Sequence, residues 1–208
     1  MPPSNVCRLR LITGIAILLE SVAVGAASPM TLVIHVIDYA QVEPFDLVRT
    51  QHDVARMFGS IGVTTNWRQE RSSSADLDNT GDVTVVILSR SMSERMFAVD
   101  HLAKGVLGRA VPSCRRAWLY FDEIEKGAVD HNVGVATLLS RVISHEVGHM
   151  VGNLPHADRG TMRPVLDLAP GRFQGFTNAE GQQIRATLSE RSVERGRVSE
   201  LATPHSVP

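Results

Sequence analysis

Two histidines and a glutamate in the C-terminal half of the chain have the spacing of a metal site with its own general base. His145 and His149 stand four residues apart, and Glu146 lies between them. On an α-helix, residues four apart share one face, about 40° apart around the axis, so both imidazoles can reach one metal ion. Glu146 is rotated by about 100° from His145, where its carboxylate can reach a water molecule on the metal. The pattern predicts a zinc site in which Glu146 activates water for attack on a carbonyl group.

The segment after this pattern offers a turn and a third ligand. Gly152 follows His149 by three residues, where a helix can end in a left-handed turn that glycine adopts at little cost. His156 and Asp158 follow the turn, and either could complete the site. We favour His156, because reaching back from Asp158 compresses the chain more; Asp158 would then be a turn residue or an acceptor for an imidazole N–H. Five further histidines lack ligand spacing and are expected at the surface or half-buried: His35, His52, His101, His131 and His205.

These residues resemble the signature of the metzincin clan of zinc metallopeptidases, HExxHxxGxxH followed by a methionine turn. The chain is also similar, over residues 31–188, to small exported bacterial proteins in which a third histidine leads into a Gly-(Ile/Thr)-Met segment, here Gly160-Thr161-Met162. It departs from the metzincin signature in having three residues, not two, between Gly152 and His156. The resemblance implies that Met162 is an apolar floor under the histidines. The alternative is that Met162 fills a gap in the core, as methionine does in many proteins.

Length and composition describe one globular domain of ordinary size. The chain has 208 residues, of which 43% are hydrophobic and 21% charged, which is enough to bury a core. We expect this domain to span residues 28–190 and the polar residues 191–208 to form a disordered tail. The formal net charge of −1 gives no indication of a nucleic-acid partner or, after removal of the N-terminal segment, of a membrane partner. The resemblance implies a protein or peptide substrate.

Residues 1–27 have the pattern of a signal peptide. Arg8 and Arg10 form a short basic region, an apolar run extends from Leu11 to Leu19, and small residues at Gly25-Ala26-Ala27 suit cleavage. The apolar run of nine residues is too short to span a bilayer of about 30 Å. An uncleaved anchor is the alternative. The pattern indicates export, and we expect a secreted or periplasmic protein.

The apolar pattern predicts an α/β fold with a mixed, twisted sheet, an active-site helix and a C-terminal helix. The run 83–88 is almost entirely apolar, which suits a central strand buried on both faces. We expect an edge strand at 106–111, a short helix at 91–98 and a polar surface loop at 71–82. Further strands are expected at 31–37, 61–67 and 117–121. This order also resembles a metzincin catalytic domain, in which an edge strand above the cleft pairs with an extended peptide.

Helical spacing and capping residues predict three longer helices. The first covers 44–58, with Gly59 just past its end. Its recurring residues are Phe45, Val48, His52, Ala55 and Phe58, with Leu47 and Val54 widening the apolar side. The second carries the metal-site pattern; it begins at a cap on Asp130 or Asn132 and runs to Val151. The third opens with the capping box Thr177-Asn178-Ala179-Glu180 and ends with the domain.

Together these features favour an exported zinc-dependent endopeptidase. His145, His149 and His156 would hold Zn²⁺, and Glu146 would be the general base. One alternative is a zinc-stabilised binding or assembly protein without proteolytic activity; another is a zinc-dependent hydrolase of a non-peptide amide or ester, which would use the same site. Glu146 distinguishes the endopeptidase from the first alternative, because a structural zinc site needs no acid beside its ligands and is usually closed by four protein ligands.

Export can be tested directly on the N-terminal segment. Protein made in a secreting host is expected to begin near Ala27 or Ser28, because cleavage follows the small residues there. N-terminal sequencing of the purified protein gives the answer. A mature protein that still begins at Met1 and stays in the cytosol would contradict the signal peptide.

Overall fold

The computed structural model describes four stretches of the chain: residues 30–71, 82–166, 168 and 174–201. In the last stretch, side chains are described as far as Val193. The predicted signal peptide lies outside the described residues, as does the part of the predicted polar loop between residues 72 and 81. Within the described stretches, no helix is long and apolar enough to cross a membrane.

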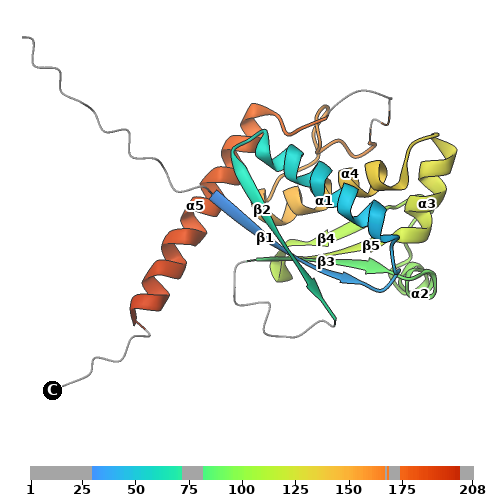
Figure 1. The fold of residues 1–208 in the computed structure, drawn as a ribbon, viewed down its shortest axis with the longest axis horizontal. Helices are drawn as coiled ribbons and strands as arrows, with labels where there is room; N and C mark the ends of the chain where they lie inside the picture. Colours follow the sequence, from blue (N-terminus) through green and yellow to red (C-terminus); the bar gives the residue numbers. More distant parts are fainter. Residues whose placement is uncertain (1–29, 72–81, 167, 169–173, 202–208) are drawn as a thin grey trace, which may run out of the picture.

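A five-stranded sheet in the order β2-β1-β3-β5-β4 forms the middle of the fold (Figure 1). Four strands run parallel, and β4 pairs with β5 in the antiparallel direction at the edge. β3 is central and buried along its whole length, as its apolar sequence predicts. The predicted mixed sheet is therefore confirmed, and so is the edge position of β4. The strands are β1 Met30–Asp38, β2 Val63–Glu70, β3 Val83–Leu88, β4 Gly108–Val111 and β5 Arg116–Tyr120.

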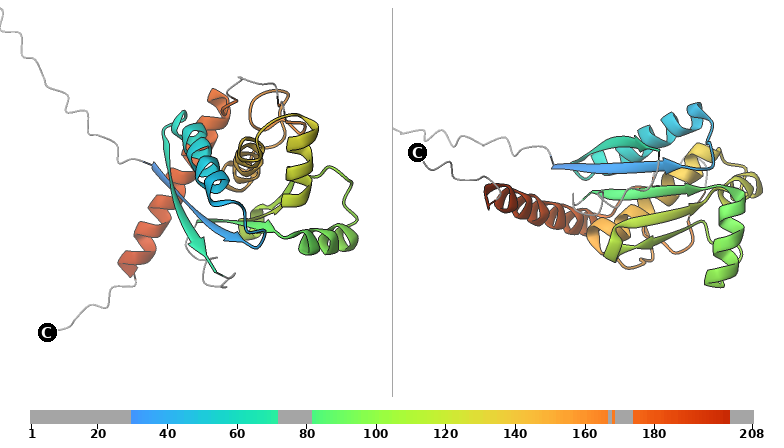
Figure 2. Two further views of the ribbon diagram at one scale, coloured as in Figure 1. Left: turned by 45° about the vertical axis from the view of Figure 1, so that its right-hand side comes forward. Right: turned by 90° about the horizontal axis from the view of Figure 1, so that it is seen from below.

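Helices lie on both faces of this sheet. α4 lies on one face between α1 and α3, while α2 packs on the opposite face (Figure 2). α4 therefore takes part in the main core, which it shares with β1, β3 and β5. This central place holds the metal-site pattern on an element that is packed on several sides. The helices are α1 Pro44–Gly59, α2 Arg90–Asp100, α3 Phe121–Asp130, α4 Val135–Gly152 and α5 Asn178–Leu201, with a short 3-10 turn, η2, at Pro112–Cys114.

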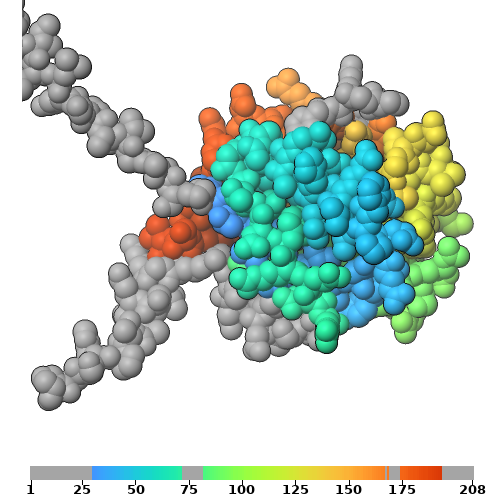
Figure 3. Space-filling model, viewed as in Figure 1, coloured from blue at the N-terminus to red at the C-terminus, as the bar shows by residue number. Residues whose placement is uncertain are grey.

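The face of α1 that enters the core agrees only in part with the predicted one: Leu47, Val54 and Phe58 are buried as expected. Phe45 and Val48 are 75% and 65% exposed, and α1 forms part of the molecular surface (Figure 3). The buried face instead carries Thr50, whose hydroxyl donates to the carbonyl of Ala136 in α4 at 3.3 Å. Both sets of residues recur at helical spacing, so the sequence alone does not choose between them; packing against α4 does. The buried residues are Leu47, Thr50, Val54, Met57 and Phe58.

Two predicted helix ends are wrong. Gly59 is the last residue of α1, and the left-handed glycine is Gly62, with φ of 75°. α4 begins after Gly134, because residues 121–130 form a separate helix, α3, that the prediction missed. Its signal was present in the sequence: two acidic residues in the first turn, followed by apolar residues at helical spacing that are buried, Ile124 and Ala128.

The capping box at the start of α5 is confirmed. The Thr177 backbone N–H donates to Glu180 Oε2 at 2.6 Å, and the Glu180 N–H donates to Thr177 Oγ1 at 3.3 Å. Ile184 and Leu188 of this helix are buried and pack in the main core. α5 continues to Leu201, beyond the expected end at residue 190, so residues 191–201 of the expected tail are helical, while 202–208 lie outside the described residues.

His35 and two carboxyl groups form a polar cluster on the face of the sheet opposite α4. His35, expected at the surface or half-buried, is only 2% exposed. Its Nδ1 lies 2.9 Å from Glu70 Oε1 and its Nε2 lies 3.2 Å from Asp82 Oδ2. Both acidic partners are far from His35 in the sequence, at the end of β2 and just before β3, so the prediction had no local signal for this burial.

Candidate metal centre

The structure brings together the three histidines that the sequence singles out. The Nε2 atoms of His145 and His149 lie 3.1 Å apart, and those of His145 and His156 lie 3.3 Å apart. Among the described residues, these three form the group of His, Cys, Asp and Glu side chains that could hold a metal ion, with ligand atoms all within 4.8 Å of one another. Asp158 is exposed and is not part of this group.

The end of α4 differs in detail from the predicted glycine turn. Gly152 is the last helical residue, and Asn153 adopts the left-handed conformation, with φ of 47°. Asparagine is one of the few side chains that tolerate it. Gly152 serves packing instead: a Cβ there would lie 2.8 Å from Leu154 Cγ and 3.1 Å from Ile184 Cγ1. The missing side chain therefore lets the returning loop and α5 approach the end of α4.

The loop after α4 returns along the helix and brings His156 to the site. Leu154 is buried, and its carbonyl accepts a hydrogen bond from His149 Nδ1–H at 2.6 Å. Further on, the Ala157 N–H donates to the Met162 carbonyl at 2.9 Å, and Gly160 turns the chain with φ of 79°. His156 is thus held between two fixed points of the loop, which absorbs the additional residue relative to the metzincin signature.

Met162 and its neighbour complete the support of the helix histidines. Met162 is fully buried and packs against Gly148, where a Cβ would lie 2.5 Å from its sulfur. Glycine at position 148 of the helix is therefore required by this contact. The carbonyl of Thr161 accepts a hydrogen bond from His145 Nδ1–H at 2.9 Å. Met162 thus contacts α4 at Gly148, which lies between the two histidines in the sequence. This place suits the apolar floor that the resemblance implies.

The hydrogen bonds at Nδ1 decide what the opposite ring nitrogens can do. Since Nδ1 of His145 and of His149 donates to a carbonyl, Nε2 of each neutral ring carries a lone pair. Burial lowers the pKa of His145 to about 4 and also lowers that of His149, so both rings are neutral at pH 7. Two lone pairs facing each other at 3.1 Å repel unless a cation lies between them.

The spacing of these nitrogens fits zinc. In a tetrahedral site with Zn–N distances of about 2.0–2.1 Å, two ligand nitrogens lie roughly 3.3–3.4 Å apart. The observed separations of 3.1 and 3.3 Å are close to this value. His145 and His149, neutral and fixed by carbonyl acceptors, also have the form in which metal-binding histidines are usually found. The three residues therefore fit a zinc ion.

Glu146 lies beside the three histidines and is itself buried, with 7% of its surface exposed. Burial raises the pKa of Glu146 to about 7, and a hydrogen bond from the backbone of Ala110 opposes this shift. Near pH 7 such a carboxyl group can both accept and release a proton. It is thus suited to the general-base role that its place in the sequence predicts.

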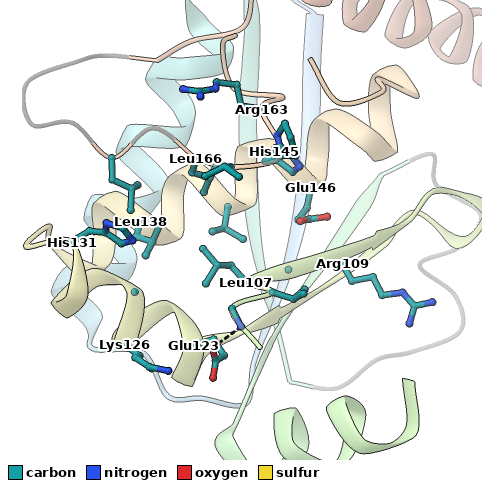
Figure 4. A pocket seen from close by; sticks show the side chains of 18 of the residues that line it. Leu107, Arg109, Glu123, Lys126, His131, Leu138, His145, Glu146, Arg163 and Leu166 are labelled. Carbon is teal, nitrogen blue, oxygen red and sulfur yellow. Dashed lines mark hydrogen bonds between the residues drawn. The ribbon is translucent and has the colours of Figure 1, made fainter. Parts of the chain in front are cut away.

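A cavity of about 800 Å³ opens next to Glu146 and the histidines. Figure 4 shows His145 and Glu146 at one end, with Leu107, Leu138 and Leu166 between them and the far end. Its walls come from the β4 region, from α3 and α4, and from the loop after Met162. The sequence did not reveal these walls, because they form only when α3 and the loop pack beside α4. The apolar lining consists mainly of Leu107, Leu138, Val142, Leu166 and Leu168.

Comparison with known proteins gives a similarity in fold. No protein-family model matches the sequence, and no curated protein is significantly similar to it. Among solved structures, the fold is similar to that of archaemetzincin from Methanopyrus kandleri, with a TM-score of 0.47 and 12% sequence identity over 79% of this chain and 99% of that chain. The chemistry of this protein is therefore inferred from its own site.

The third ligand can be tested by two substitutions in the returning loop. His156→Ala removes one of three converging nitrogens and is expected to weaken zinc binding by more than about 100-fold. Asp158→Ala changes an exposed side chain outside the cluster. Zinc affinity should therefore fall by no more than the roughly 10–100-fold typical of groups that orient a ligand. Zinc titration against a competing chelator measures both. The reverse order would assign the ligand to Asp158.

Proposed function

We propose that this protein is an exported zinc-dependent endopeptidase. The observation that supports this most is the convergence of three histidine nitrogens beside a buried carboxyl group, at the end of a cavity large enough for a substrate side chain. Export is proposed from the N-terminal pattern alone. Hydrolysis of a peptide bond needs polarisation of a carbonyl and a group that moves a proton from water to the leaving amine, and the site offers residues for both tasks.

Each residue has a distinct task in this proposal. His145, His149 and His156 would hold zinc, which supplies Lewis acidity towards a carbonyl oxygen and towards water. Glu146 accepts the proton of the attacking water on its carboxylate and then releases it to the leaving nitrogen. Its pKa of about 7 suits both transfers, because neither protonation state is strongly favoured near neutral pH.

The number of ligands favours catalysis over a structural role. Among the described residues, the cluster contains three donors, and a structural zinc site is usually closed by four. A purely structural site would also gain nothing from a carboxyl group that is buried beside the ligands, since such burial is costly without function. Both observations support an open site that a substrate can approach.

The cavity indicates where a substrate side chain would lie. Gly127 of α3 stands in its wall, and a Cβ there would lie 3.2 Å from Leu138 and 3.8 Å from Leu107. Because position 127 has no side chain, the space between these two leucines extends to the helix. We therefore propose that a large apolar residue next to the scissile bond enters the cavity, while the substrate backbone runs along β4.

Glu146→Gln separates catalysis from metal binding. Glutamine keeps the size of the side chain but cannot accept the proton, so turnover is expected to fall at least about 100-fold, while zinc content and thermal stability stay near those of wild type. Cleavage of a peptide library by wild type and variant, together with metal analysis, measures both effects. Near-wild-type turnover by the variant would remove Glu146 from the mechanism.

Gly127→Leu tests the depth of the cavity. The new side chain fills the space between Leu138 and Leu107, so kcat/KM for peptides with a large apolar residue beside the scissile bond is expected to fall at least tenfold relative to peptides with alanine there, roughly the cost of rejecting one or two methylene groups. Gly59→Leu is the matched control, because its position is open. An unchanged ratio for Gly127→Leu would place the substrate side chain elsewhere.

A further inference from the structure

Gly108 lies where the edge strand β4 meets the carboxylate of Glu146. A Cβ at this position would lie 2.8 Å from Glu146 Oε1, 3.0 Å from Glu146 Cγ and 3.0 Å from Val142 Cγ1. A contact of 2.8 Å to a real Cβ is essentially absent from proteins, so a side chain at 108 and the present place of the carboxylate oxygen exclude each other. We infer that Gly108 is the residue that positions the general base, by leaving the space that its carboxylate occupies.

The pairing of β4 explains why the carboxylate comes to this strand. Tyr120 N–H donates to the Leu107 carbonyl at 3.0 Å, and Arg109 pairs with Trp118 in the same register. In an antiparallel ladder the backbone groups of successive residues point to opposite sides. The backbone N–H and C=O groups of Leu107 and Arg109 point towards β5. Those of Gly108 and Ala110 therefore point towards the free edge of the sheet.

The free edge supplies the hydrogen bond that holds Glu146. Ala110 binds the carboxylate through its backbone, and Ala110 and Gly108 lie on the same face of the strand because they are two residues apart. The carboxylate thus reaches the Ala110 N–H across position 108. A methyl group at 108 would stand in that path.

The group that has to move is the carboxylate of Glu146, not the backbone of β4 or α4. Glu146 Oε1 is the far end of a flexible side chain, whereas β4 is fixed by its pairing with β5 and α4 is fixed by its packing in the core. Gly108→Ala is therefore expected to rotate the Glu146 side chain away from Ala110. The three histidines should stay in place, because none of them is among the atoms that the new Cβ would meet first. The consequence for catalysis rests on the proposed function, but the displacement does not.

Amide exchange at Ala110 tests the displacement without any enzymatic assay. In the zinc-loaded full chain, Gly108→Ala is expected to make the Ala110 amide exchange at least about tenfold faster, because the carboxyl group that accepts its hydrogen bond has moved. The Arg109 amide, which faces β5, and the zinc content should stay unchanged. Gly59→Ala, at an open position of α1, is the matched control and should alter neither amide. Equal exchange at Ala110 in folded wild type and folded Gly108→Ala would overturn the inference.

A double-mutant cycle provides a second measurement on stability. Glu146→Ala removes the two atoms that a Cβ at 108 would meet first, so the Tm loss caused by Gly108→Ala should shrink by about half or more in this background. If Gly108→Ala alone does not fold, recovery of folding in the double variant supports the inference. A Tm loss that is the same in both backgrounds, or a double variant that also fails to fold, assigns the effect to Val142 and overturns it.

Peptide cleavage distinguishes failure of this inference from failure of the proposed function. With an active wild type, Gly108→Ala should lower kcat about 10–100-fold and leave KM within about twofold, since the base is misplaced while the leucines that line the cavity are unchanged. A wild type that cleaves no peptide would contradict the proposed function, and exchange and stability would still decide the role of Gly108. Wild-type kcat in folded Gly108→Ala would contradict the positioning role.

Discussion

Two hydrogen bonds from imidazole N–H groups to backbone carbonyls set the requirements that the rest of this structure meets. Because Thr161 and Leu154 provide the acceptors, the loop after α4 has to return along the helix that carries His145 and His149. Such a return is possible only if the loop and α4 can approach closely, which the glycines at 148 and 152 permit. The geometry of the site is therefore a property of helix and loop together.

The three clustered histidines and the carboxylate of Glu146 are held by different parts of the fold. The histidines depend on α4 and its returning loop, whereas the carboxylate of Glu146, although it belongs to α4, is bound by the edge strand β4. The distance between helix and sheet edge thus sets where the carboxylate lies relative to the histidines. α4 is fixed at this distance by packing between α1 and α3 over the sheet, which is the kind of rigid support that a site with strict geometric demands needs.

What could be predicted from the sequence is what depends on residues near one another in the chain. The i, i+4 spacing of His145 and His149 identified two members of the cluster, and β3 and the capping box at Thr177 were equally local signals. Where two residues or two faces had similar local preferences, tertiary contacts decided. Asn153 rather than Gly152 became left-handed, since Gly152 was needed for packing against Leu154 and Ile184.

The remaining features depend on contacts between distant segments. The burial of His35 requires Glu70 and Asp82 from two other parts of the chain, so its own neighbours in sequence gave no signal. The cavity next to the histidines is lined by the segment before β4 and by α3, which are joined by the hydrogen bond from the Gly105 N–H to Glu123 at 3.1 Å. Neither partner has a sequence pattern that points to the other.

The free edge of β4 also has a consequence for the behaviour of the protein in solution. Among the described residues no further strand pairs with this edge, so its backbone groups, apart from the Ala110 N–H that binds Glu146, can pair with a second copy of the same chain as well as with a peptide. Such an edge is a starting point for aggregation. β4 limits this in two ways: it has only four residues, and it carries an exposed arginine, Arg109, whose ion pair with Asp100 places opposite charges at the edge. A short, charged edge is open to a transient extended segment while offering too little length for lasting self-association.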